Sequence, residues 1–177
     1  MIMSAGRPVL LTGEGLVLRE WAENDIQAMV ELFDDPDIAK RTPLPSPFTL
    51  DEARDRLAKA KQSARLLLAV TTDGQRPLGE VLLIAPGELG YMIGARHRGA
   101  GLAARALVLL RDHAHQALGL PVLRLKIEPD NVASAEVARR AGFRLKEEGA
   151  EVVENKGRRC ILDVWEHGQP GAGGPAS

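Results

Sequence analysis

The chain has 177 residues, which suits one domain with a sizeable buried core, and its 45% hydrophobic and 27% charged residues are typical of globular proteins. A net charge of −1 and an aromatic content of 3% argue against bulk attraction to nucleic acid or an anionic membrane, and against a surface that stacks bases. Cys160 is the only cysteine, which excludes an intrachain disulfide and indicates a reducing compartment. Residues 1–13 lack the apolar region of a signal peptide and no stretch could span a bilayer, so we expect a cytoplasmic protein.

The first part of the chain is predicted to hold one strand and two helices. Residues 16–21 favour the strand, and Asn24 is expected to cap the helix that follows it. Asp-Asp-Pro at residues 34–36 should end this helix. The proline-rich residues 42–47 cannot form a regular helix, because prolines lack a backbone donor and restrict their neighbours. Thr49 then begins a capping box at the start of the second helix.

The hydrophobic period changes in the middle of the chain. Residues 66–72, 78–84 and 89–93 are predicted strands, and turn signals at residues 73–74 and 85–87 separate them. These three strands should therefore form an antiparallel meander.

The second half alternates between helices and strands. Its predicted elements are a helix over 101–118, a strand over 122–127, a helix that Asn131 caps and that ends at 141–142, a strand from Phe143 and a strand over 159–165. The strand–helix–strand step implies one locally parallel pair. We therefore expect a single α/β (α+β) domain over residues 1–167, with a mixed, mostly antiparallel central sheet of about six to seven strands and helices on both faces. Residues 168–177 are rich in Gly and Pro and are expected to form a flexible tail.

Residues 96–103, Arg-His-Arg-Gly-Ala-Gly-Leu-Ala, form a glycine-rich segment at the start of the predicted helix, which we call the glycine loop. A helix N-terminus offers unpaired N–H groups and about half a positive charge. Gly99 and Gly101 remove side chains that would keep a phosphate from those amides, and Arg96 and Arg98 add cationic arms. The loop therefore predicts a diphosphate-binding site.

Several ligand classes use this type of site. Residues 99–104 match the dinucleotide fingerprint G-x-G-x-x-A, which alone would support a nicotinamide-dependent oxidoreductase. That motif belongs in the first βαβ unit of a parallel sheet, whereas here it follows an antiparallel hairpin. Its acidic partner, expected about 20 residues later, would fall at Leu120 and Pro121. A P-loop would need Gly-Lys-Ser/Thr, which is absent. A helix that merely starts with glycines is the alternative without a ligand.

Two segments at a defined spacing narrow these choices. Arg96, Gly99 and Gly101 match a Q/R-x-x-G-x-G/A motif after a meander, and Asn-Val-Ala-Ser at 131–134 precedes Ala-Gly-Phe at 141–143. Together they resemble the two conserved blocks of the GNAT superfamily of N-acetyltransferases. The resemblance implies the GNAT acyl-CoA N-acyltransferase fold and acetyl-CoA as co-substrate.

The N-terminal half refines the resemblance. Leu-Arg-Glu-Trp at residues 18–21, Asp25 and the proline-rich step before Phe48 are similar to the RimJ/RimL-type branch, which includes acetyltransferases of ribosomal-protein N-termini. The resemblance spans residues 15–166 and implies a pantetheine site between the strands at 90–94 and 122–128. Strand-like backbone pairing and pyrophosphate contacts would then come from Met92, Ile93, Gly94, Arg96, Arg98, Gly99, Ala100, Gly101, Leu102 and Ala103, and Asn131 would contact the pantetheine arm.

The resemblance also assigns catalytic roles. Many relatives protonate the leaving thiolate with a tyrosine whose matching position here is Ala138, and the only tyrosine of the chain is Tyr91. In the RimJ/RimL-type branch a serine serves instead, and Ser134 stands at its place, with helix capping as the alternative role. A backbone N–H near Met92 and Ile93 is the implied oxyanion donor.

Two carboxylates are candidates for the general base. Glu80 and Glu88 flank the meander turn, and either could accept the ammonium proton through water, although a solvated strand carboxylate is the alternative reading. Glu88 is favoured because it precedes Leu89-Gly90-Tyr91, as in the Glu-x-Gly-Tyr pattern of the branch.

The expected activity is acetyl transfer from acetyl-CoA to a primary amine, on a protein N-terminus or a small molecule, by direct attack in a ternary complex. A non-catalytic CoA-binding regulatory domain is the alternative, because Tyr is missing at position 138. The four histidines show no metal-ligand spacing, so no metal is expected. Neither nucleic acid nor a membrane is an expected partner, and a homodimer is possible. The acceptor itself is not encoded in a readable motif.

Overall fold

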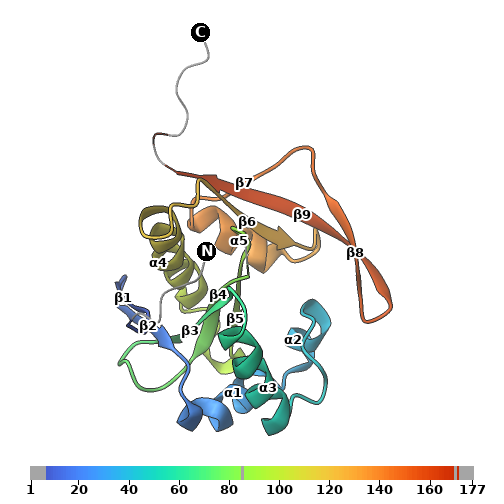
Figure 1. The fold of residues 1–177 in the computed structure, drawn as a ribbon. Coiled ribbons are helices and arrows are strands. Elements are labelled where there is room, and N and C mark those ends of the chain that lie inside the picture. Colours follow the sequence, from blue (N-terminus) through green and yellow to red (C-terminus); the bar gives the residue numbers. More distant parts are fainter. Residues whose placement is uncertain (1–6, 85, 170, 172–177) are drawn as a thin grey trace.

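The computed structural model describes residues 7–84, 86–169 and 171 and arranges them around two sheets that meet at a splayed edge (Figure 1). The predicted flexible tail covers residues 168–177, of which residues 170 and 172–177 lie outside the described residues. The strands are β1 (Leu10–Gly13), β2 (Leu16–Glu20), β3 (Leu66–Thr71), β4 (Gly79–Leu83), β5 (Leu89–Ile93), β6 (Val122–Ile127), β7 (Arg144–Leu145), β8 (Glu151–Asn155) and β9 (Arg158–Gly168). The α-helices are α1 (Ile26–Phe33), α2 (Pro36–Arg41), α3 (Leu50–Lys61), α4 (Leu102–Gln116) and α5 (Val132–Arg140), with 3₁₀ turns at Glu23–Asp25 and Ala95–His97.

The first sheet is antiparallel throughout, in the order β1-β2-β3-β4-β5. The second has the order β6-β9-β7, and β8 pairs with β9. Among the described residues, the two sheets are joined by one parallel bridge between Glu88 and Arg124, where the Arg124 N–H donates to Gly87 O over 2.8 Å. The predicted mixed, mostly antiparallel sheet and its locally parallel step are confirmed.

Strand β3 shows why helices cover both faces of the first sheet. All six of its residues are buried, and successive side chains point to opposite faces. Leu68 and Val70 join the core under α4, whereas Leu67 and Ala69 join the core under α1, α2 and α3. Because each face of β3 packs on helices, the strand reads as a continuous apolar run instead of an alternating one.

Several sequence-based boundaries need correction. The first helix is not capped by Asn24: Asp25 accepts a hydrogen bond from the Ala22 N–H over 2.8 Å and so closes the 3₁₀ turn that precedes α1. Pro36 ends α1 as expected but also opens α2, where Asp35 is the N-cap and a proline at the first position loses no hydrogen bond. Strands β1 and β8 escaped prediction because they are largely exposed edge strands without apolar alternation.

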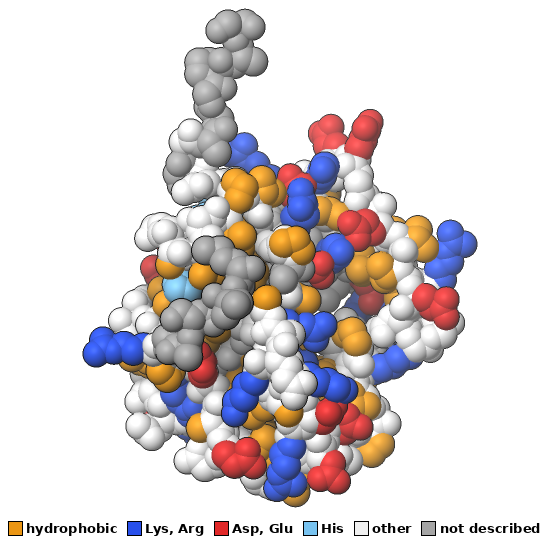
Figure 2. Space-filling view, viewed as in Figure 1, with side chains coloured by type: hydrophobic (Ala, Val, Ile, Leu, Met, Phe, Trp, Pro, Cys, Tyr) orange, Lys and Arg blue, Asp and Glu red, His pale blue; other side chains and the backbone are white. Residues whose placement is uncertain are grey.

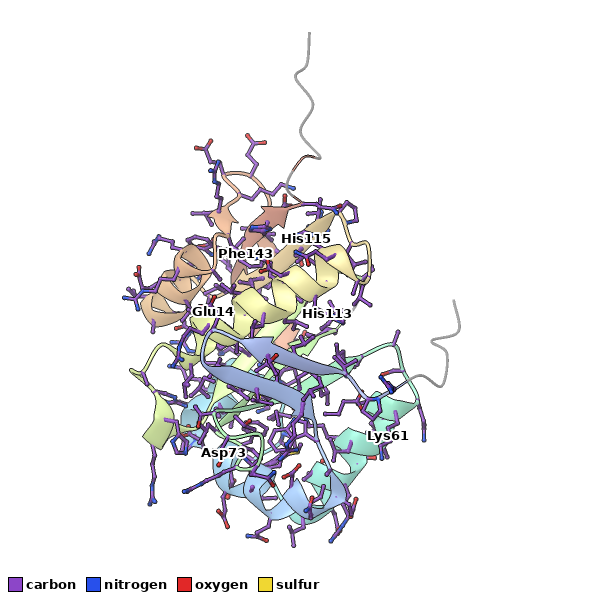
Figure 3. All side chains as sticks on the ribbon, turned by 90° about the vertical axis from the view of Figure 1, so that its left-hand side faces the viewer. Glu14, Lys61, Asp73, His113, His115 and Phe143 are labelled. Carbon is purple, nitrogen blue, oxygen red and sulfur yellow. The ribbon has the colours of Figure 1, made fainter. Side chains whose placement is uncertain are left out.

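A contact between His115 and His167 joins α4 to β9, and Figure 3 shows His115 close to Phe143. His115 bonds Leu120 O over 2.6 Å through Nδ1 and the ring of His167 over 2.9 Å through Nε2. The His167 ring also lies 5.4 Å from that of Phe143. Burial lowers the pKa of His167, and the neighbouring Arg111 and His115 lower it further, against a weaker opposite effect of Asp112.

This pKa shift makes a prediction about stability. Because the pKa of His167 is lower in the fold than its usual value of 6.5, the unfolded chain binds the proton more tightly. The contribution of His167 to the free energy of unfolding is therefore complete above pH 6.5 and is lost as the pH falls below this value. We expect urea unfolding to show a loss of stability between neutral and mildly acidic pH that is smaller in His167→Asn than in the parent. His97→Asn, outside the cluster, should retain the parental slope; equal slopes in all three proteins would contradict the expectation.

Candidate functional site

Two cavities open beside the splayed edge of β5. One, here called the loop cavity, measures about 610 Å³ and lies between α2, β5, the glycine loop and α5. The other, here called the α3 cavity, also measures about 610 Å³ and is bounded by the segment after α2, α3, β4 and the end of β6. The residues that line both cavities, here called the junction, are Arg41, Thr42, Tyr91, Met92, Asn131 and Ser134. The two cavities therefore share the junction as a common part of their walls, and together they are here called the cleft.

The ladder between β4 and β5 decides which backbone groups face this cleft. The Ile84 N–H donates to Glu88 O over 2.8 Å and the Gly94 N–H donates to Leu78 O over 3.0 Å. In an antiparallel pair such hydrogen-bonded positions recur every second residue. Gly90, Met92 and Gly94 are thus engaged within the sheet, and the N–H and C=O groups of Tyr91 and Ile93 face the open edge.

The glycine loop turns from β5 into the N-terminus of α4. Gly99 and Gly101 have φ values of +84° and +71°, in the left-handed region that favours glycine. A Cβ at Gly99 would meet nothing within 4 Å, so its conformation, not crowding, requires glycine there. Both glycines line the loop cavity together with Leu102, Ala103 and Ala104. The first amides of α4, which have no partner within the helix, therefore border this cavity.

The two arginines of the loop differ in their contacts. Arg98 lines the loop cavity, donates from Nε to Ile93 O over 3.1 Å and lies 3.7 Å from the carboxylates of Asp35 and Asp37. Its guanidinium thus ties the loop to α2. Arg96 is exposed in the 3₁₀ turn. Of the predicted ligand-binding residues that the structure describes, those outside the loop-cavity lining are Gly94, Arg96 and Ala100.

Arg105 is a contributor that the sequence interpretation missed. Its guanidinium donates to Ala100 O over 3.1 Å, to Gly101 O over 3.4 Å and to Glu14 O over 2.9 Å. It therefore holds two loop carbonyls and the turn between β1 and β2 in place. Its position one helical turn after Gly101 is the only sequence signal that could have revealed it.

The lining of the loop cavity holds more cations than carboxylates: Lys40, Arg41, Arg98 and Arg140 against Asp37 and Glu136. Carboxylates just outside the lining also pair with two of these cations, Asp130 and Glu128 with Arg41 and Asp35 with Arg98. On the face shown in Figure 2, Lys and Arg side chains are interspersed with Asp and Glu side chains. A polyanionic ligand of the diphosphate type therefore fits the loop cavity, although the chain as a whole has a net charge of −1.

Two hydroxyl groups meet at the junction. Ser134 lies in the first turn of α5, where its N–H donates to Asn131 Oδ1 over 3.2 Å, so Asn131 is the N-cap that the sequence predicts. The Tyr91 hydroxyl donates to Ser134 Oγ over 2.7 Å. Burial raises the pKa of Tyr91, against a smaller lowering by the Ser134 hydrogen bond. The sequence interpretation assigned Tyr91 to the core strand and gave no sign of this contact.

The two candidate bases occupy different environments. Glu88 lines the α3 cavity, and its carboxylate lies 3.0 Å from Lys126 Nζ, which also pairs with Glu151 over 2.9 Å. Glu80 is fully buried, pairs with Arg56 and lies outside the lining of both cavities. Burial raises the pKa of Glu80. Glu80 is therefore a structural partner of Arg56 in the core, and Glu88 is the one of the two candidate bases that faces the cleft.

The His, Cys, Asp and Glu side chains of the described residues form no group of three or more that could hold a metal ion. Every helix in the described part of the chain is too short or too polar to cross a membrane.

A family model described as "Acetyltransferase (GNAT) domain" matches residues 15–144. The chain belongs to the GNAT acetyltransferase family. It is 27% identical over 164 residues to the uncharacterized N-acetyltransferase p20 of Bacillus licheniformis, a match that covers 86% of this chain and 90% of the relative. The family assignment makes the chain an acetyltransferase and places the G-x-G-x-x-A coincidence within a GNAT motif.

Solved structures share this GNAT fold. RimJ of Mycobacterium smegmatis, in complex with CoA-disulfide, has a TM-score of 0.76 and 20% identity, with coverage of 91% of this chain and 86% of that one. An acetyltransferase of Salmonella typhimurium that modifies the N-terminal serine of ribosomal protein L7/L12 has a TM-score of 0.78 and 18% identity, with coverage of 91% and 99%. At these identities the likeness concerns the fold, which agrees with the RimJ/RimL-type resemblance of the sequence.

The glycine loop allows a direct test of ligand binding. Gly101→Glu places a side chain and a negative charge at the N-terminus of α4, so we expect it to abolish the rise in melting temperature that CoA produces in the parent protein. Gly119→Glu is the matched control, because Gly119 follows α4 at its other end with a φ of +66° and open space around it. It should retain the response to CoA. Stabilisation of the parent by NAD but not by CoA would refute the assignment.

Proposed function

We propose that this GNAT protein transfers the acetyl group of acetyl-CoA to a primary amine, on a protein N-terminus or a small molecule. The observation that carries the proposal is the junction, at which the loop cavity and the α3 cavity meet around Ser134 and Tyr91. Separate compartments allow donor and acceptor to be bound at the same time. Direct attack in a ternary complex is the mechanism that this arrangement favours.

The loop cavity fits the donor. Amides of residues 98–103 at the N-terminus of α4 suit the pyrophosphate, and the surrounding cations suit a polyanion. The outward-facing N–H and C=O groups of Tyr91 suit an extended pantetheine arm, which would pair with β5 as an added strand. The side-chain amide nitrogen of Asn131 remains for the same arm, because only its Oδ1 is used in the cap of α5.

The α3 cavity fits the acceptor. Glu88 and Glu128 are carboxylates on its wall, and Leu44, Phe48 and Leu125 give it an apolar surface. An amine arrives mostly as its ammonium form, so a carboxylate that takes a proton from it is needed before attack. Glu88 is the proposed base, acting directly or through one water.

The chemical step then involves three groups of the chain. The neutral amine attacks the thioester carbonyl, and the Ile93 N–H at the open edge of β5 stabilises the oxyanion. Ser134 donates a hydrogen bond to the sulfur as the C–S bond breaks. The similar Salmonella typhimurium acetyltransferase, which modifies an N-terminal serine, supports a peptide N-terminus as one acceptor class.

The first prediction of this proposal concerns Ser134. Ser134→Ala removes the hydroxyl but keeps the backbone N–H that Asn131 caps, so α5 should remain intact. We expect kcat to fall about a hundredfold, the magnitude of a lost acid, while the affinity for CoA stays within about twofold. Thiol release from acetyl-CoA, measured with a panel of amines and N-terminal peptides, gives kcat, and the rise in melting temperature with CoA concentration gives the affinity.

Ser63→Ala is the matched control, because it removes an exposed serine hydroxyl that bonds Ala60 O at the end of α3, outside both cavities. It should leave kcat unchanged. Parental turnover in Ser134→Ala would mean that the Ser134 hydroxyl has no catalytic role and that the residue serves only in the cap of α5. If CoA stabilises the parent but no acceptor of the panel gives thiol release, the non-catalytic regulatory alternative replaces the enzyme.

A second prediction distinguishes the role of Glu88 as a base from its ion pair with Lys126. Glu88→Gln should lower kcat/KM by about a hundredfold, because a neutral amide cannot accept the ammonium proton. Glu151→Gln removes the other carboxylate that pairs with Lys126 but does not line the α3 cavity, so it should leave kcat/KM unchanged. Parental kcat/KM in Glu88→Gln would assign the base elsewhere.

A further inference from the structure

We infer that Tyr91 is a positioning residue whose hydroxyl fixes Ser134 so that the serine O–H points into the junction, toward the sulfur of the donor. The inference rests on the proposed role of Ser134 and adds a second hydroxyl to it. Tyr91 influences the reaction only through Ser134. The two residues lie on β5 and α5 and are 43 positions apart in the sequence.

Both partners of the hydrogen bond are held by rigid elements. The Tyr91 backbone belongs to β5, whose register with β4 is fixed, and its ring packs against the core under α4. Ser134 is held by the cap of α5, which involves its own N–H. The distance of 2.7 Å between Tyr91 Oη and Ser134 Oγ is therefore a property of the scaffold and not of mobile side chains.

The direction of the bond follows from the chemistry of the two groups. A phenol is more acidic than an aliphatic alcohol and is the better donor, so Tyr91 donates and Ser134 accepts. Ser134 has one hydrogen, which is then available to a different acceptor. Because both cavities reach Ser134, that acceptor can be a group bound at the junction. Burial raises the pKa of Tyr91, which keeps its phenol protonated for this task.

The reaction balances with Tyr91 unchanged. The amine nitrogen forms a bond to the carbonyl carbon, the C–S bond breaks, and its electron pair leaves with the sulfur. The nitrogen loses two protons: one passes from the ammonium to Glu88 before attack and on to water, and the second passes to water in the cleft after attack. The sulfur gains one proton through the Ser134 hydroxyl, which water in the cleft reprotonates in the same step, so one proton is released overall. Tyr91 keeps its proton throughout and acts only by orienting Ser134.

A double-mutant cycle tests this coupling. Tyr91→Phe removes the hydroxyl and keeps the ring, so we expect kcat to fall about tenfold, with the KM for acetyl-CoA within about twofold of the parent. In a Ser134→Ala background the same substitution should have no further effect on kcat, because its partner is already missing. An effect of equal size in both backgrounds, or none in the parent, would overturn the inference.

A spectroscopic readout needs no substitution at position 91. Tyr91 is the only tyrosine, so biosynthetic incorporation of fluorotyrosine places one fluorine label in the chain, provided that any purification tag lacks tyrosine. Loss of the 2.7 Å hydrogen bond in Ser134→Ala changes the surroundings of the phenol and should shift the fluorine resonance. Ser63→Ala is expected to leave the resonance unchanged.

The two sets of outcomes separate this inference from the proposed function. A fluorine resonance that does not respond to Ser134→Ala overturns the hydrogen bond even if Tyr91→Phe fails to fold. Parental kcat in Ser134→Ala overturns the role of Ser134 itself. A loss of kcat in Ser134→Ala, without coupling to Tyr91, retains the proposed function and rejects the positioning role.

Discussion

The parting of β5 from β6 after a single parallel bridge is the constraint on which the cleft depends. At the bridge, the Arg124 N–H bonds Gly87 O, and a Cβ on Gly87 would lie 2.7 Å from Val122 O. Only glycine lets the two strands come this close at that point. Beyond it the strands diverge, so the N–H and C=O groups of Tyr91 and the N–H of Ile93 lose a neighbouring strand and become available to a ligand, whereas Ile93 O accepts from Arg98 Nε. The open edge exists because a pairing is interrupted.

A distant hairpin supports the other wall of the cleft. Helix α2 and the residues after it border both cavities, yet α2 has only six residues and little core of its own. The turn between β8 and β9 supplies Asn155, Lys156 and Arg158, which donate to Thr42 O, Ala39 O and Lys40 O respectively. In Figure 1 this hairpin extends from the second sheet toward α2. Orphan carbonyls at the end of α2 are thus satisfied by side chains more than 110 positions away.

Local signals predicted the parts of the site that local geometry determines. The bounds of β5 and β6, the cap by Asn131 and the glycine-rich entry to α4 depend on periodicity, capping and positive φ, which a sequence displays directly. Other features depend on strand register and on the packing of distant segments. One is which of Met92 and Ile93 turns its backbone groups toward β4, and another is the set of ion pairs of Arg98 with Asp35 and Asp37. Such contacts have no periodic signature. Strand β8 was missed for a related reason, because its stability comes from pairing with β9 and not from an apolar face.

The position of the phenol follows from the core. In relatives that use a tyrosine on the helix after the second block, the matching position here is Ala138, and it is fully buried in the core under α4 with Ala141 and Phe143. A tyrosine side chain there would need far more volume than this packed core offers. In this chain the phenol reaches the junction from β5 instead, and it meets a serine on α5 at hydrogen-bond distance. The helix keeps a small residue for packing, and the strand supplies the aromatic hydroxyl.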